Sequence, residues 1–269
     1  MTGVILAAGF GSRLRRPSAA GPLGMGSLKP TTKVAGMALL ERAVRSLEVA
    51  GCVRIVIVVG YGRDAVMASL RGYQGRADIG FVDNPLYDLK NGVSLLAARE
   101  HIRSDRFVLT MADHVVGDEV MRLAGAHVSS RVALGAAAKG DTATLGAATK
   151  GDMATLGAAT LLVDKKLYSI FDMDDATKVW ADGARLVKIG KTITPFNCVD
   201  TGVFVGTDAL MDAIAEVYRR TGDASLSEGV QALADRGAMS VLDIGHGFWQ
   251  DVDTPAMLAF AERELARRG

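Results

Sequence analysis

The chain has 269 residues, of which 49% are hydrophobic and 23% are charged, and its formal net charge at pH 7 is +1. This is the composition of an ordinary globular protein, and it excludes both a disordered chain and a string of many domains. The balanced charge gives no support to nucleic-acid binding, which needs a surplus of Lys and Arg on one surface.

Neither the hydropathy pattern nor the cysteines indicate an export or membrane segment. No stretch approaches the roughly 18 uninterrupted apolar residues of a membrane-spanning helix, and the N-terminus lacks the basic region of a secretory signal. Cys52 and Cys198 lie far apart, form no ligand cluster with His, and are few enough for a reducing compartment. We therefore expect a cytoplasmic protein with no membrane segment.

The first half of the chain alternates short apolar runs with segments of helical periodicity. The apolar runs predict strands at Val4–Ala8, Arg54–Val59, Ile79–Val82 and Phe107–Met111. The helical segments are Leu39–Val49, Gly92–Arg103 and Asp118–His127. Strands that alternate with helices predict an α/β fold with a mostly parallel sheet and right-handed crossovers.

The second half predicts a mixed extension of this sheet, because its first strands are joined by turn-rich pieces and not by helices. The predicted strands are Leu161–Asp164, Ala184–Ile189, Thr201–Val205 and Met239–Ile244. The predicted helices are Asp208–Arg220, Ser227–Asp235 and Thr254–Arg267, the last with Pro255 in its first turn. We expect a single domain over residues 1–269.

A tandem repeat interrupts this pattern. Residues 134–144, 145–155 and 156–160 repeat with a period of 11, which is too few copies for a stable solenoid. The complete units contain Gly-Asp and Thr, which weaken a continuous helix. We predict that residues 134–155 are an insertion without chemistry, since long surface insertions cost little loop entropy. Residues 17–27, rich in Gly, Ala, Pro and Ser, predict a further loop.

A glycine-bearing loop, LAAGFGSRL, follows the first predicted strand. Gly9 and Gly11 would let the backbone approach phosphate oxygens. The dinucleotide fingerprint needs a third glycine where a leucine stands, and the P-loop needs Gly-Lys-Ser/Thr, so neither motif fits. Arg13 and Lys29 place two cations near the loop, as a polyphosphate requires. A strand-to-helix turn with solvated basic residues is the alternative interpretation.

Aspartates at two places in the sequence suit a cation site. Asp113 follows the predicted strand Phe107–Met111, and open α/β sheets bind ligands at the carboxyl ends of their strands. Asp251 and Asp253 alternate in WQDVDT, so they share a face if this segment is extended. Carboxylate oxygens are hard ligands of the kind that hold Mg²⁺. A helix cap or turn at Asp113 and a solvated Asp251 are the alternatives.

Seven ordered segments resemble a known enzyme family. Leu-Ala-Ala-Gly-x-Gly-x-Arg followed by Lys-Pro is similar to the signature of nucleotidyltransferases that join an NTP to a sugar or alcohol phosphate. KNGVSLL, LTMADHV, DATKV, VKIGK, CVDTGVF and WQDVDT follow in order over nearly the whole chain. The set most resembles the CTP:inositol-1-phosphate cytidylyltransferases, within the MobA-like sugar-phosphate nucleotidyltransferases. The resemblance implies a Rossmann-like three-layer α/β/α fold with a mostly parallel mixed sheet and a small acceptor-side β extension.

The same resemblance implies roles for individual residues. It implies an NTP-binding half at residues 1–130 and an acceptor-binding half at residues 156–253. The implied nucleotide-binding residues are Leu6, Ala7, Ala8, Gly9, Gly11, Ser12, Asn91, Gly92 and Ser94. The implied catalytic residues are Arg13, Lys29, Asp113 and Lys178. The implied ligands of Mg²⁺ are Asp113, Asp251 and Asp253.

Acceptor binding is expected in the second half of the chain. Through DATKV the resemblance implies that Lys178 holds the acceptor phosphate, and Lys188 lies with it across a predicted turn. Asp200 and Thr201 are suited to hydrogen-bond polyol hydroxyls, although Asp-Thr-Gly is also an ordinary strand-edge turn. For all four residues, solvated or structural roles are the alternatives.

We predict Mg²⁺-dependent transfer of a cytidylyl group from CTP to inositol 1-phosphate, giving CDP-inositol and pyrophosphate. Another acceptor (phosphocholine, a phosphonate or a sugar 1-phosphate) or another NTP is the first alternative, and a non-catalytic nucleotide-binding regulatory module is the second. In the inositol family the transferase is often fused to a membrane enzyme that consumes CDP-inositol to make an osmolyte or lipid. A separate membrane CDP-alcohol phosphotransferase is therefore an expected partner.

Overall fold

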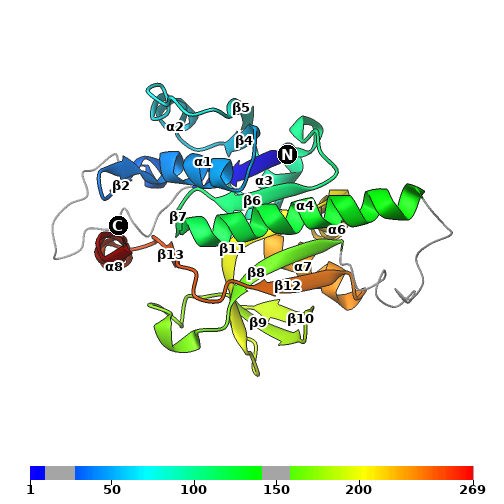
Figure 1. The fold of residues 1–269 in the computed structure, drawn as a ribbon. Helices are drawn as coiled ribbons and strands as arrows, with labels where there is room; N and C mark the ends of the chain where they lie inside the picture. The colour runs from blue at the N-terminus through cyan, green and yellow to red at the C-terminus, as the bar shows by residue number, and fades with distance from the viewer. Residues whose placement is uncertain (10–27, 141–157, 269) are drawn as a thin grey trace.

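The computed structural model describes residues 1–9, 28–140 and 158–268. Within these residues one nine-stranded sheet dominates the fold (Figure 1). Its strands, in spatial order, are β5 (Asp78–Asp83), β4 (Arg54–Val59), β1 (Thr2–Leu6), β6 (Phe107–Met111), β11 (Cys198–Gly206), β8 (Ala159–Asp164), β12 (Met239–Asp243), β10 (Arg185–Gly190) and β9 (Lys178–Asp182). The fold therefore has the predicted α/β class.

The sheet changes from parallel to mixed at its centre. Strands β5, β4, β1 and β6 pair in parallel, whereas β11 pairs antiparallel with both β6 and β8. Strand β12 is parallel to β8, and β9 and β10 form an antiparallel hairpin at the far edge. This hairpin is the small β extension that the resemblance implied.

Alternate residues of the strands face two separate cores. Val4 and Leu6 of β1 belong to a core covered by α3 (Asn91–Ala97), α6 (Asp208–Thr221) and α7 (Leu226–Asp235). Ile5 points to the opposite face, which α1 (Leu39–Val49), α2 (Arg63–Ala68) and α4 (Asp118–Gly140) cover. Each such buried side chain contributes about 1.5–3 kcal/mol of hydrophobic stabilisation. Two helical layers around one sheet confirm the three-layer expectation.

A smaller cluster attaches the C-terminal helix to one end of the sheet. Helix α8 (Pro255–Arg268) packs near two short two-stranded sheets, β13 (Trp249–Asp251) with β7 (His114–Val116) and β2 (Lys33–Val34) with β3 (Met37–Ala38) (Figure 1). Val115, Phe248, Val252 and Ala261 are buried together in this cluster. Because β7 starts directly after Asp113, this packing also fixes part of the candidate site.

Several predicted elements need correction. Helix α4 reaches Gly140, beyond the predicted end at His127, and so enters the first repeat unit. Three consecutive alanines in that unit favour helix strongly enough to explain the extension. Residues 141–157, which hold most of the remaining repeat, lie outside the described residues. Strand β9 and helix α2 were not predicted, because both are short and weakly periodic.

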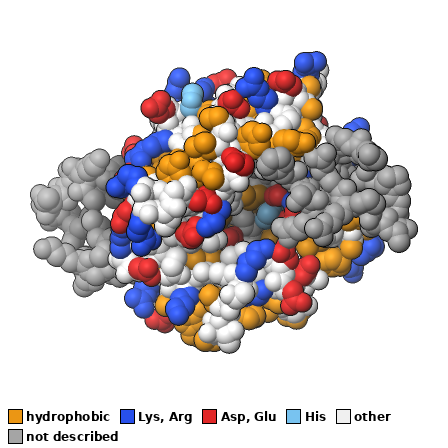
Figure 2. Space-filling model, turned by 180° about the vertical axis from the view of Figure 1, so that it is seen from behind, with side chains coloured by type: hydrophobic (Ala, Val, Ile, Leu, Met, Phe, Trp, Pro, Cys, Tyr) orange, Lys and Arg blue, Asp and Glu red, His pale blue; other side chains and the backbone are white. Residues whose placement is uncertain are grey.

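The surface charges, the two cysteines and the apolar character of the helices can now be located in the structure. Figure 2 shows basic and acidic side chains interspersed over the face seen from behind, as a net charge of +1 would suggest. Cys52 and Cys198 are buried and free. Among the described residues, no helix combines the length and the apolar character needed to cross a bilayer.

Candidate active site

A cavity of about 830 Å³ opens at one edge of the main sheet. Its lining includes Leu6 at the end of β1, Asp113 after β6, and Asp164 at the end of β8. Strand β11 runs in the opposite direction, so its first residues, including Asp200, reach the same edge. This is the carboxyl edge at which open α/β sheets bind ligands.

Lys29 lies among three carboxylates of this cavity. It belongs to the 3₁₀ turn Lys29–Thr31 and is only 8% exposed. Its Nζ donates to Asp113 Oδ2 at 2.6 Å and also to Asp253 Oδ1. The same Nζ lies 3.8 Å from Asp251 Oδ1. One ammonium thus faces three acids that are distant in sequence, and negative charge is in excess.

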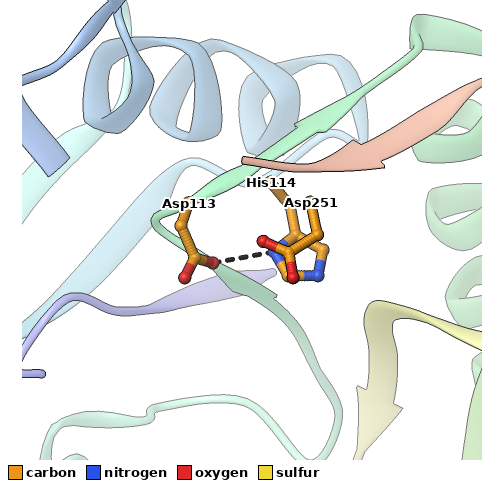
Figure 3. Close-up of side chains that lie close together, drawn as sticks. All are labelled: Asp113, His114 and Asp251. Carbon is orange, nitrogen blue, oxygen red and sulfur yellow. Dashed lines mark hydrogen bonds and ion pairs between the residues drawn. The ribbon is translucent and has the colours of Figure 1, made fainter. Parts of the chain in front are cut away.

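The pairing of two short strands explains how Asp251 reaches Asp113. Strand β13 pairs antiparallel with β7, which places Asp251 opposite His114. The Val252 amide then donates to the Asp113 carbonyl at 3.0 Å. Figure 3 shows the side chains of Asp113, His114 and Asp251 gathered in one space. The segment is extended, as the alternation in WQDVDT required, and Asp251 and Asp253 both reach Lys29.

His114 holds the Asp113 carboxylate. Its Nδ1 lies 2.7 Å from Asp113 Oδ1, and its ring stacks on Trp249 with centroids 6.0 Å apart. Burial lowers the pKa of His114, but the bond to Asp113 and the Asp113 charge outweigh it, and the net pKa is raised. Burial alone would raise the pKa of Asp113. Lys29 and His114 lower this pKa by more than burial raises it, so the net pKa lies well below its usual range.

The acidic side chains fit a divalent cation. Carboxylate oxygens of Asp175, Asp251 and Asp253 lie within 4.8 Å of one another, as do ligand atoms of Asp113, His114 and Asp251. Asp251 Oδ1 is buried and accepts no hydrogen bond within the described part of the chain. Burial, reinforced by the Asp113 charge, raises the pKa of Asp251 despite the opposing effect of His114. An oxygen-rich cluster with excess negative charge and an unsatisfied oxygen is what Mg²⁺ prefers.

Asp175 was missed as a site residue by sequence reasoning. The signal was present, because Asp175 opens the DATKV segment that carries part of the family resemblance. Its carboxylate also accepts from Lys191 Nζ at 2.5 Å. The sequence gives no indication that this loop folds back onto Asp251 and Asp253.

Two of the predicted acceptor residues stand next to each other but face different surroundings. Asp200 lines the cavity, and its Oδ1 accepts from the Gly202 amide at 2.7 Å. Burial raises the pKa of Asp200 to about 6, although Gly202 and His114 oppose the shift. Thr201 is fully buried and donates to the Leu162 carbonyl at 2.7 Å, which ties β11 to β8.

Gly202 is a position where only glycine fits. Its φ is +73°, and a Cβ built there would lie 2.6 Å from the His114 ring. Glycine therefore allows β11 to approach His114, which in turn contacts Asp113.

The predicted nucleotide-binding residues divide into three groups. Those that line the cavity are Leu6, Ala7, Gly9 and Asn91. Those that are buried away from the lining are Ala8, Gly92 and Ser94. Those that lie outside the described residues are Gly11 and Ser12, as does the predicted catalytic residue Arg13.

The buried group has structural contacts. Ser94 accepts from Asn84 Nδ2 at 3.0 Å, and a Cβ on Gly92 would meet the Ala224 carbonyl at 2.6 Å. The Ala8 carbonyl accepts from the Tyr61 amide at 3.1 Å. These contacts support the walls of the cavity from behind.

Neither of the two predicted acceptor lysines, Lys178 and Lys188, lines the cavity formed by the described residues. Lys178 is buried at the start of β9 and donates from Nζ to the Asp174 carbonyl at 3.0 Å. Lys188 is exposed on β10. Among the described residues of the second half of the chain, the lysines that line the cavity are Lys166 and Lys191. The acceptor-binding roles of Lys178 and Lys188 therefore stay predictions.

Comparisons with known proteins agree with this architecture. Residues 3–243 match the model of the MobA-like NTP transferase domain family. The "Bifunctional IPC transferase and DIPP synthase" of Rubrobacter xylanophilus is 31% identical over 265 residues, which cover 96% of this chain but only 50% of that protein. The "CMP-5'-(3-aminopropyl)phosphonate synthase" of Streptomyces rubellomurinus is 39% identical over 132 residues, covering 48% of this chain and 20% of that protein.

A solved structure extends the comparison to the whole fold. The inositol-1-phosphate CTP transferase from T. maritima superposes with a TM-score of 0.73 at 25% identity, covering 97% of this chain and 96% of that one. The predicted nucleotidyltransferase fold is thus confirmed. With the family model spanning most of its length, this chain belongs to the MobA-like NTP transferase domain family.

Proposed function

We propose that this chain transfers a cytidylyl group from CTP to an alcohol phosphate, with inositol 1-phosphate as the preferred acceptor. The observation that carries the proposal is the meeting of Lys29 with Asp113, Asp251 and Asp253 at one rim of the cavity. The choice of CTP and inositol 1-phosphate is supported by the similarity to the inositol-1-phosphate CTP transferase from T. maritima.

The proposed reaction is an in-line displacement at phosphorus. An oxygen of the acceptor phosphate forms a bond to the α-phosphorus of CTP while the bond from that phosphorus to the bridging oxygen breaks. Pyrophosphate leaves with the electron pair, and the product is a CDP-alcohol. The attacking oxygen is already anionic, so no strong general base is needed. The difficulty is to bring two anions together, and this requires fixed positive charge.

The residues of the cavity rim are suited to supply and hold that charge. Lys29 provides one cation directly, and Arg13 in the glycine loop is proposed as a second, although it lies outside the described residues. We propose that Asp113, Asp251 and Asp253, with Asp175 beside them, hold a divalent cation, and that this cation is Mg²⁺. When bound, such a cation neutralises phosphate oxygens and aligns them. His114 positions the Asp113 carboxylate.

The experiment is a pyrophosphate-release assay with CTP, UTP, GTP and ATP, each against a panel of phosphorylated alcohols and aminoalkylphosphonates. CTP with inositol 1-phosphate is expected to give the highest kcat/KM. If an aminoalkylphosphonate is turned over fastest, the result would favour a phosphonate as the acceptor, which is the alternative suggested by the similarity to the Streptomyces phosphonate synthase. Silence with every pair would overturn the proposal in favour of a nucleotide-binding regulatory module.

A consuming enzyme is the proposed functional partner. The Rubrobacter relative carries two activities in its name, and the present chain covers 50% of that protein. We propose that a membrane CDP-alcohol phosphotransferase uses the CDP-alcohol made here. Membranes that contain such an enzyme should consume the purified CDP-alcohol when they are added to the assay. If the CDP-alcohol is not consumed, the proposal of this partner is wrong.

A further inference from the structure

The cavity is lined by a lysine that the family resemblance did not single out. Lys166 lines the cavity just after β8, and its side chain is 23% exposed. The neighbouring Lys165 is 48% exposed, lies 3.9 Å from Asp243 Oδ2, and is absent from the lining among the described residues. Two adjacent lysines thus differ in whether they face the cavity.

A buried carboxylate holds Lys166 in place. Asp164 is 3% exposed, and its Oδ1 accepts from the Lys166 amide at 2.7 Å and from Lys166 Nζ at 2.8 Å. The Gly245 carbonyl accepts from the same Nζ at 2.6 Å. An ammonium has three N–H donors, and the described residues accept two of them. One donor of a preorganised cation is therefore left for a ligand.

The same carboxylate connects Lys166 to the acidic cluster. Asp164 Oδ2 accepts from Trp249 Nε1 at 3.0 Å, and the Trp249 ring stacks on His114. His114 in turn bonds to Asp113. Asp164 therefore fixes both the lysine and the aromatic wall between that lysine and the proposed reaction centre. A site held this way loses little conformational entropy when a ligand binds.

The order of the strands indicates which substrate Lys166 meets. The sheet runs β1, β6, β11, β8, so Asp113 after β6 lies between Gly9, which follows β1, and Lys166, which follows β8. Two strand spacings place β8 about 10 Å from β6. The nucleotide is proposed to lie on the β1 side, which leaves the β8 side for the second substrate.

We propose that Lys166 binds the acceptor, donating its remaining N–H to an oxygen of a polyol phosphate, and that Asp164 positions both Lys166 and Trp249. This assignment rests on the proposed function and deepens it. It places a cation of the acceptor subsite just after β8, in addition to any contribution from Lys178 or Lys188.

The test compares Lys166→Met with the matched control Lys165→Met. With CTP and inositol 1-phosphate, Lys166→Met should raise the KM for the acceptor by about 10- to 100-fold, the range expected for one charged hydrogen bond, and change the KM for CTP less than about 2-fold. Lys165→Met should change neither KM. Calorimetric titration of inositol 1-phosphate alone should show the same loss of affinity for Lys166→Met.

The other possible outcomes of this test separate the role of Lys166 from the proposed function. An unchanged acceptor KM in an active Lys166→Met variant, or an equal rise in both KM values, would overturn the assignment and leave the proposed function standing. Absence of transfer by the unmodified protein would instead overturn the proposed function. If Lys166→Met does not fold, Asp164→Asn/Lys166→Met removes the buried charge together with its partner. The amide oxygen of that asparagine still accepts from Trp249, so the same acceptor-specific rise is expected.

Discussion

At the scale of single residues, Asp113 is the carboxylate that both Lys29 and His114 hold at the proposed reaction centre. Lys29 and His114 each bond to one of its carboxylate oxygens. Asp113→Asn keeps the shape of the side chain but removes the charge that would hold a cation. We expect kcat to fall by roughly 100- to 1,000-fold, as for the loss of one key electrostatic group, and the melting temperature to fall as well, because Lys29 and His114 stabilise the ionised carboxylate in the folded protein.

Pyrophosphate release and a thermal melt measure these two quantities for Asp113→Asn. Asp118→Asn is the control, because Asp118 is exposed at the start of α4 and pairs with Arg122 on the surface. Near-normal turnover by Asp113→Asn would remove Asp113 from the mechanism.

Asp200 makes stability depend on pH. Burial raises its pKa from 3.8 to about 6 in the folded protein. Between about pH 4 and about pH 6 the folded protein therefore binds more protons than the unfolded chain, so the free energy of unfolding falls as pH rises through this window. The variant Asp200→Asn has no carboxylate to ionise, so it should be about 3 kcal/mol more stable than the unmodified protein at neutral pH.

Urea unfolding near neutral pH and at about pH 4 measures the Asp200 effect, because the two proteins should converge where the carboxyl is protonated. An identical difference in stability at both pH values would show that the charge of Asp200 is not its cause.

The position of a side chain at the cavity could be predicted from the sequence where a strand end or strand alternation locates it, whereas the roles of these side chains stay predictions. Asp113 was predicted from its position after an apolar strand, and Asp251 and Asp253 from their alternation. Lys166 and Asp175 could not be predicted this way, because their positions depend on loops that return to the sheet edge. Lys166 and Lys165 are indistinguishable in sequence, and only the structure shows which one Asp164 holds.

At the scale of elements, the start of β11 depends on Gly202. Gly202→Ala meets two costs, a φ of +73° and a Cβ 2.6 Å from the His114 ring. Gly222→Ala is a matched control, because Gly222 has a φ of +76° at the end of α6 and open space around its Cβ. We expect Gly222→Ala to cost about 1 kcal/mol of stability and Gly202→Ala about 1–3 kcal/mol more.

Gly202→Ala should also reduce turnover, because displacement of His114 disturbs the Asp113 carboxylate, whereas Gly222→Ala should not. Chemical unfolding and the pyrophosphate assay measure the two effects. Equal loss of stability in both variants would mean that the contact with His114 carries no strain.

Elements with strong local patterns were predictable, and elements that depend on a distant partner were not. Helix α1 and strands β4 and β6 have the predicted bounds, because an amphipathic pattern or an apolar run determines each one. Strand β7 was not predicted, since its three residues become a strand only by pairing with β13. That pairing is what brings Asp251 to Asp113.

At the scale of the whole molecule, the distribution of charge differs between the surface and the cavity. The net charge is +1, yet the cavity rim brings Asp113, Asp175, Asp251 and Asp253 close to Lys29 and Lys191. Four carboxylates against two ammonium groups leave a local excess of negative charge in a partly buried place. Such crowding opposes folding unless a cation compensates for it.

Divalent cations should therefore stabilise the folded protein without any nucleotide. A ligand at ten times its Kd that binds only the folded state adds about 1.4 kcal/mol, which corresponds to a rise of about 3–6 °C in melting temperature for a chain of this size. The measurement is a thermal melt in MgCl₂ against KCl at equal ionic strength. The variant Asp251→Asn/Asp253→Asn should lose most of the rise, because it lacks two of the four carboxylates. An equal rise in the variant would place the cation elsewhere on the molecule and separate the acidic cluster from its proposed role.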